Sequence, residues 1–204
     1  MIIRKSYAFP EPDAREIYRY MGVHSEPDEA VKSLVKEAVE KLRGVVSCKV
    51  CYTKLPIERP DENTLIIGKI RTESVFLKKN LEDCSHAYLF FATVGNAPDR
   101  LIASMKHTPS KALALDAGAS AVVEALCNTL NEEIRIKEAS EGNFLRPRYS
   151  AGYGDFTLEY QKYFVEMLDA PKNVGVTLRN EAMLYPAKSV SALIGVSDKE
   201  RTLK

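Results

Sequence analysis

The sequence predicts an α+β fold in which helices pack on a central, twisted, mostly antiparallel sheet. Short β-rich apolar segments and helical segments follow one another without regular alternation. Several of the strand segments are close enough along the chain to pair antiparallel. The 204 residues show no internal repeat and no linker, which predicts one domain over residues 1–204. Residues 1–44 would supply a strand and helices, and residues 45–204 the sheet-and-helix core.

Hydrophobic spacing predicts the individual elements. The most continuous apolar run, residues 87–94, indicates a central strand. Further strands are expected over residues 1–10, 45–55, 64–68, 174–178 and 189–196. Helices are expected over residues 13–21, 28–42, 74–82, 98–107, 110–137 and 158–168. The polar end, residues 197–204, is expected to fray.

Composition and charge narrow the class of protein. Lys and Arg total 29 and Asp and Glu 28, so a net charge of +1 does not suggest a nucleic acid or an anionic membrane as partner. No apolar run approaches the roughly 20 residues of a spanning helix. A charged pair, Arg4-Lys5, interrupts what would be the apolar region of a signal peptide. A cytoplasmic protein is therefore expected.

The cysteines indicate a structural role. Cys48 and Cys51 form a Cys-x-x-Cys pattern within residues 45–52, which are rich in strand formers. Residues three apart on a strand point to opposite faces, so these thiols are not expected to bridge or to share a metal. Cys84, Cys127 and the three histidines stand alone in the sequence. No metal site is predicted.

The helix over residues 110–137 carries a regular polar line. Its first half is apolar almost all round, which is typical of a buried helix. The polar exceptions recur at every fourth residue and form one line up one face: Asp116, Ser120, Glu124 and Asn128. The line is either the strip that meets water or a polar seam that lines a site.

Residues 138–157 lack periodicity and contain three Gly and four aromatic residues, a pattern more typical of a functional loop than of an idle one. Arg148 could grip a carboxylate, Gly152 would let the backbone approach a ligand, and Tyr153 could pack beside it. The other interpretation is a loop with an exposed arginine and packed aromatic rings. No Gly-rich phosphate loop or nucleophile elbow is present, and no catalytic side chain is predicted.

Three matches in order, within residues 110–196, give a family resemblance. Arg148-Tyr-Ser-Ala-Gly-Tyr153 resembles the Arg-x-x-x-Gly-Tyr signature of the activation (reactivation) domain of cobalamin-dependent methionine synthase, which binds S-adenosylmethionine there. Residues 180–195 resemble that domain's Ala-Met-x-Pro-x-x-Ser-Val-Ser region, with one extra residue before the proline. Glu124 falls at the position of the family's ligand-binding glutamate. The family fold is α+β with a central twisted antiparallel sheet.

The resemblance implies a binding role for five residues. Arg148 would hold the carboxylate of S-adenosylmethionine, and Glu124 would meet its ammonium group. Ser150 and Gly152 would contact the ligand through backbone groups, and Tyr153 would pack and hydrogen-bond beside it. Asp116 and Ser120, on the same helix line, could extend this polar wall. None of these side chains would act as acid, base or nucleophile.

The resemblance also implies a function. A chain of this length has no room for the cobalamin, folate or homocysteine modules of the synthase. The expected function is a free-standing reactivation subunit, an accessory to methyltransferase activity in methionine biosynthesis. It would support reductive methylation of cob(II)alamin on a separate corrinoid protein or a methionine synthase lacking its own activation domain. The electron would come from flavodoxin or another donor, and a homodimer is plausible.

Two alternatives stay open at this point. Ala151 stands where the synthase usually has Pro, and the family's additional tyrosine has no clear counterpart in residues 197–204. These departures motivate a non-catalytic corrinoid-protein partner or scaffold that kept the fold and lost S-adenosylmethionine binding. A less favoured alternative is an unrelated small-molecule enzyme on the same fold.

Overall fold

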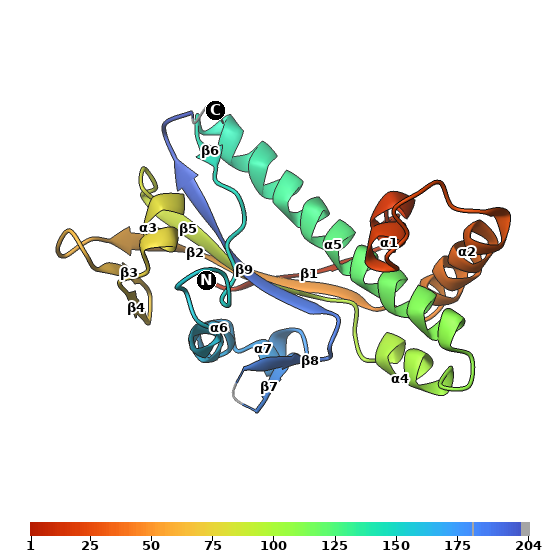
Figure 1. The fold of residues 1–204 in the computed structure, drawn as a ribbon. Helices are drawn as coiled ribbons and strands as arrows, with labels where there is room; N and C mark the ends of the chain where they lie inside the picture. Colours follow the sequence, from red (N-terminus) through yellow and green to blue (C-terminus); the bar gives the residue numbers. More distant parts are fainter. Residues whose placement is uncertain (181, 201–204) are drawn as a thin grey trace.

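The computed structural model describes residues 1–180 and 182–200, and its main feature is an antiparallel sheet (Figure 1). Six of the described strands lie side by side in this sheet. A further strand, β1 (Ile3–Tyr7), also pairs with β2. The order along the path is β4 (Ile70–Thr72), β3 (Leu65–Ile67), β2 (Cys48–Glu58), β5 (His86–Thr93), β9 (Ser189–Ser197) and β6 (Phe144–Leu145). The predicted fold class, α+β with a mostly antiparallel sheet, is confirmed.

The middle of the sheet is β5, between β2 and β9. Phe90 pairs with Tyr52 on one side and with Ala192 on the other. From Ala87 to Thr93 the strand is buried, because layers of side chains cover both faces of the sheet. The prediction of a central strand over residues 87–94 is therefore confirmed.

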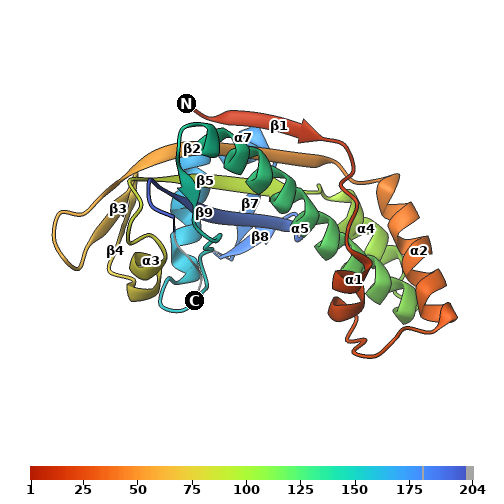
Figure 2. The ribbon, with the colours of Figure 1, turned by 90° about the horizontal axis from the view of Figure 1, so that it is seen from above.

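One face of the sheet carries the long helix α5 (Pro109–Ser140). Its second half packs Leu126, Leu130 and Ile134 against the strands. Its first half extends past the sheet and contacts α1 (Ala14–Tyr20), α2 (Glu29–Arg43) and α4 (Ala97–Ser104) (Figures 1 and 2). By length and composition α5 could cross a membrane, but 61% of its apolar window is buried inside the protein. We therefore assign it as a core helix.

The opposite face of the sheet carries shorter helices. Phe164 and Leu168 of α6 and Leu77 of α3 pack with Phe91 and Leu193 of the strands. These elements are α3 (Val75–Asn80), the 3₁₀ turn η1 (Leu158–Tyr160), α6 (Gln161–Leu168) and α7 (Ala170–Asn173). A two-stranded ribbon, β7 (Thr177–Arg179) with β8 (Met183–Tyr185), lies beyond them.

The cysteine prediction is confirmed in its geometry. Cys48 lies in the core beneath α5, and Cys51 lies in the core on the other face of the same strand. Burial raises the pKa of Cys48 to about 11 and that of Cys51 to about 12. Both thiols are therefore protonated at neutral pH and contribute to packing.

Several element boundaries predicted from the sequence are wrong. The strand predicted over 174–178 is shifted toward the C-terminus, because α7 ends only at Asn173 and strand pairing begins at Thr177, the first residue of β7. The segment 138–157 is not wholly irregular: α5 continues to Ser140, and β6 pairs with the end of β9. Ser197 does not fray, since it is the buried last residue of β9, and residues 201–204 lie outside the described residues.

Glu138 ties the end of α5 to the sheet. Its carboxylate is fully buried and accepts hydrogen bonds from Lys54 Nζ at 2.8 and 2.9 Å and from the Tyr88 hydroxyl at 2.5 Å. Asn143 Nδ2 donates a further hydrogen bond at 3.0 Å. A buried carboxylate is costly unless it is paired and hydrogen-bonded. Here strands β2 and β5 supply the partners, so the network fixes the position of the helix end.

Gly195→Ala in β9 is expected to lower the free energy of unfolding by about 2 kcal/mol through overpacking. A Cβ atom there would lie 2.5 Å from Cys84 Sγ and 2.6 Å from Leu81 Cδ2, and both of these side chains are buried. Gly44→Ala is the matched control, since its Cβ would meet only Lys41 O at 3.6 Å. Urea unfolding of both variants measures the difference, and equal stabilities would contradict the packing described here.

Candidate functional site

The polar line of α5 faces two cations. Arg148 Nη2 donates to Glu124 Oε2 at 3.0 Å and to Asn128 Oδ1 at 3.1 Å. Ser120 and Asp116 lie one and two helical turns before Glu124. Lys188 Nζ is 2.9 Å from Ser120 Oγ and 2.9 Å from Asp116 Oδ1. The structure therefore favours the polar seam over a strip of side chains that meets only water. We call these four helix residues with Arg148 and Lys188 the seam.

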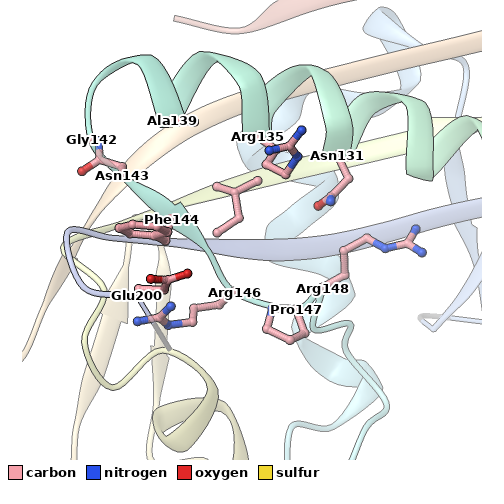
Figure 3. A pocket seen from close by; sticks show the side chains of 11 residues that line it. Asn131, Arg135, Ala139, Gly142, Asn143, Phe144, Arg146, Pro147, Arg148 and Glu200 are labelled. Carbon is pink, nitrogen blue, oxygen red and sulfur yellow. The ribbon is translucent and has the colours of Figure 1, made fainter. Parts of the chain in front are cut away.

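Strand β9 positions the segment that carries Arg148. Arg146 N donates to Gly195 O at 2.9 Å, and Tyr149 exchanges two backbone hydrogen bonds of 2.9 Å with Leu193. This pairing holds residues 146–149 extended beside the strand, and the Arg148 side chain reaches across to α5 (Figure 3). The side chains of Arg148 and Glu124 are 26% and 38% exposed, so solvent and small ligands can reach both.

The loop after Arg148 is compact and internally bonded. Gly152 has a φ of +96°, which favours glycine, and its N–H donates to Phe156 O at 2.7 Å. Ser150 is half-buried, and its carbonyl accepts from Tyr153 N at 3.4 Å. The Tyr153 side chain is 65% exposed and so can contact a ligand or a partner. Because the Gly152 N–H is used within the loop, it is not offered to a ligand in this conformation.

Asp155 anchors the loop to the opposite face of the sheet. Its carboxylate accepts from the Ser74 hydroxyl and, at 2.6 Å, from Val75 N at the start of α3. These hydrogen bonds hold the pKa of Asp155 below its usual range. The loop is therefore fixed at both ends, by β9 and by α3.

The structure brings together some of the predicted site residues and not others. Arg148 and Glu124 are in direct contact, whereas Ser150, Gly152 and Tyr153 follow in the adjoining loop. Lys188 and Asn128 also belong to the seam, although sequence reasoning did not select them as site residues. Asn128 could have been selected from its place on the helix line. Lys188 precedes the last strand, and only the fold brings it to α5.

Cys127 lies beside the seam but offers no nucleophile. The thiol is buried, and burial raises its pKa to about 12, even though the nearby Arg148 acts in the opposite direction. Within residues 1–180 and 182–200, no cluster of His, Cys, Asp or Glu side chains could hold a metal ion. The charged and polar side chains of the seam are suited to binding a charged ligand.

A cavity of about 840 Å³ adjoins the seam at Arg148. It lies between the second half of α5 and the segment that contains β6 (Figure 3). Its lining residues are Asn131, Arg135, Ala139, Gly142, Asn143, Phe144, Leu145, Arg146, Pro147, Arg148 and Glu200. Pockets that hold small molecules commonly have this size.

Comparison with solved structures finds the same fold in the crystal structure of the MetH reactivation domain bound to AdoHcy. That domain and this chain superpose with a TM-score of 0.74 and share 16% sequence identity, over 100% of this chain and 80% of that chain. No family model and no curated protein sequence matches this chain. The comparison therefore shows that this chain has the fold of the MetH reactivation domain.

Proposed function

We propose that this chain is a free-standing reactivation protein that binds S-adenosylmethionine and supports reductive methylation of cobalamin on a separate corrinoid protein. The observation that carries the proposal is the contact between Arg148 and Glu124. These two residues have opposite charge and come from separate segments of the chain. The MetH reactivation domain, which shares the fold, is bound to AdoHcy in its crystal structure.

The charges of the seam suit the amino-acid end of S-adenosylmethionine. Arg148 offers a guanidinium group, which binds carboxylates through paired hydrogen bonds. Glu124 offers a carboxylate to the ligand's ammonium and sulfonium charges. On binding, Arg148 would exchange the Glu124 carboxylate for the carboxylate of the ligand. Glu124 would exchange the Arg148 guanidinium for the ammonium group of the ligand. The cost of separating the pair would therefore be offset by two new charged contacts.

The roles of the remaining residues follow from their positions. Tyr153, with its ring largely exposed, would pack against the ligand and donate from its hydroxyl. Ser150 would contribute backbone groups, and Asn128 could support the Glu124 side of the site. When bound, S-adenosylmethionine supplies the methyl group and leaves as S-adenosylhomocysteine. The protein's task is to hold the ligand in an orientation from which that group can be transferred.

Exposed apolar side chains next to the loop support a partner protein on this face. Val75 and Phe76 of α3 are 65% and 58% exposed, and Leu158 is 45% exposed. A Cβ at Gly154 would lie 2.9 Å from the Phe76 ring, and one at Gly152 would lie 2.8 Å from Leu158 Cδ2. These apolar groups therefore border the loop that contains Tyr153. We infer that a corrinoid-binding protein docks here, with flavodoxin or another donor supplying the electron.

A second candidate function is a corrinoid-protein partner that no longer binds S-adenosylmethionine. Two observations favour it: the Gly152 N–H donates within the loop, and Arg148 and Glu124 neutralise each other. In that case the seam would be a structural contact between α5 and the β9 edge.

Arg148→Ala is expected to reduce S-adenosylmethionine-dependent methylation of cobalamin at least about 100-fold, the loss expected when one partner of a charged contact is removed. The assay follows the cobalamin spectrum of a corrinoid protein with a one-electron donor and S-adenosylmethionine. Arg71→Ala, an exposed change on β4, is the control and should retain activity. Methylation that Arg148→Ala leaves unchanged would contradict the proposal. Binding to the corrinoid protein without any methylation would favour the second candidate.

A further inference from the structure

The polar face of α5 continues from the seam into the cavity. Glu124 and Asn128 of the seam are followed at helical spacing by Asn131 and Arg135, which line the cavity. In Figure 3 the Asn131 side chain lies between those of Arg135 and Arg148. Arg148 bonds to Glu124 and Asn128 and also lines the cavity, so it lies where seam and cavity meet. A ligand that touches Arg148 can therefore extend into the cavity.

The cavity suits an uncharged group. Each arginine of its lining has an acidic partner, at 2.5, 3.9 and 3.0 Å in the pairs Arg135–Glu132, Arg146–Asp83 and Arg148–Glu124. Apolar surface comes from Phe144, Leu145 and Pro147. Since the positive charges of the lining are matched and part of it is apolar, a neutral group fits here better than an ion.

Asn131 offers the cavity a side-chain amide. The residue is half-buried, and the described part of the chain gives its side chain no hydrogen-bond partner. An asparagine amide presents an N–H donor beside an acceptor oxygen, which matches the amino group and the adjacent ring nitrogen of adenine. One helical turn further, Arg135 presents a planar guanidinium held by two hydrogen bonds from Glu132. Bases stack on such a plane.

The spacing along α5 fits one ligand that spans both places. Asn131 follows Glu124 by seven residues, which is about 10 Å along the helix axis. In S-adenosylmethionine a chain of about nine bonds joins the carboxylate carbon to the base, and at about 1.2 Å a bond it reaches about 11 Å when extended. In the other direction the seam continues to the ion pair of Lys188 and Asp116, which offers charges rather than apolar surface.

We propose that the cavity holds the adenosyl part of the ligand, with the adenine base on the Asn131 amide and against the Arg135 guanidinium. This inference rests on the proposed function, because it places the amino-acid end of the same ligand on Arg148 and Glu124. It makes Asn131 the residue that selects adenine. Hypoxanthine, the base of inosine, presents a carbonyl oxygen in place of the amino group, so the amide cannot pair with both of its positions.

The test titrates the full chain with S-adenosylhomocysteine, adenosine and inosine and follows the ¹⁵N–¹H resonances of the Asn131 side-chain amide. Their assignment comes from the spectrum of Asn131→Leu, which lacks them. We expect S-adenosylhomocysteine and adenosine to shift these resonances saturably, and adenosine to bind about tenfold more tightly than inosine. In Asn131→Leu, adenosine affinity should fall about tenfold and the preference over inosine should be lost. An unchanged preference in this variant overturns the role of Asn131.

Matched controls separate recognition from folding. Leucine favours a helix more than asparagine does, so Asn131→Leu is expected to fold. Asn63→Leu, the same change at an exposed loop position, should leave all affinities unchanged. Arg135→Ala removes only an exposed ion pair and should weaken adenosine binding several-fold through the lost stacking. Arg100→Ala, an exposed change on α4, is its control.

The outcomes distinguish this inference from the proposed function. If S-adenosylhomocysteine binds Asn131→Leu as tightly as the parent protein, the adenosyl site in the cavity is overturned and the proposed function stands. If adenosine binding depends on Asn131 while Arg148→Ala leaves S-adenosylhomocysteine affinity unchanged, the cavity is supported and the proposed function is contradicted. If none of the three compounds binds, both are overturned.

Discussion

Glu138→Ala is expected to lower the free energy of unfolding by about 3–5 kcal/mol, because it breaks a buried charged network. The substitution removes the carboxylate and leaves Lys54 Nζ and the Tyr88 hydroxyl without their acceptor in the protein. Urea unfolding at pH 7 measures the loss. Glu141→Ala, an exposed change at the end of the same helix, should alter stability by no more than about 0.5 kcal/mol. Equal effects of the two changes would show that the buried network does not stabilise the fold.

The same carboxylate predicts how stability depends on pH. Burial alone would raise the pKa of Glu138, but the hydrogen bonds from Lys54, Tyr88 and Asn143 outweigh it, and the net pKa lies below 4.5. A carboxyl whose pKa is lowered by folding stabilises the folded state above its unfolded pKa, and the stability is lost as the pH falls through the folded pKa. Glu138→Gln should therefore flatten the decline in stability below pH 4.5. A decline as steep as that of the parent protein would assign the acid sensitivity to other groups.

Arg148→Ala is expected to weaken S-adenosylmethionine binding at least about 100-fold, equivalent to roughly 3 kcal/mol. The change removes the group that would hold the ligand's carboxylate and leaves Glu124 without its present partner. Glu124→Gln should weaken binding by a smaller factor, about 10-fold, because Gln can still accept a hydrogen bond from the ammonium group. Calorimetric titration measures both affinities.

The double variant tests whether the two residues act as one site. Since Arg148 and Glu124 contact each other, their effects on ligand affinity should not add. Arg71→Ala is again the surface control. Additive losses, or an affinity that neither single change alters, would contradict a shared site at the seam.

The parts of the fold with long hydrophobic patterns were predictable from the sequence. The central strand β5 and the helix α5 bury many residues in succession, so their periodicity identifies them. The position of Cys48 and Cys51 on opposite faces follows from the two-residue period of a strand in the same way. The spacing of polar residues also predicted the polar line of α5. It did not show that Arg148 and Lys188 contact this line.

The remaining features depend on contacts between distant segments. Strands β4 and β8 have three residues each, too few to show a period, and pairing with a neighbour defines them. Lys188 and Arg146 lie at their sites because the register on β9 places them there, beside α5 and beside the cavity. A local sequence pattern does not show which residues of distant segments pair with one another. On the strand side of the seam, Arg148 was therefore predictable from its motif, whereas Lys188 was not.

The central claim is that the Arg148–Glu124 pair opens to bind the amino-acid end of S-adenosylmethionine. The most direct measurement is a crystal structure of the protein grown with saturating S-adenosylhomocysteine, the demethylated and more stable form of the ligand. The account predicts the ligand's carboxylate on the Arg148 guanidinium, its ammonium group facing Glu124, and the present contact between these two side chains broken. A ligand bound elsewhere, or a complex in which Arg148 and Glu124 still bond each other, would contradict it.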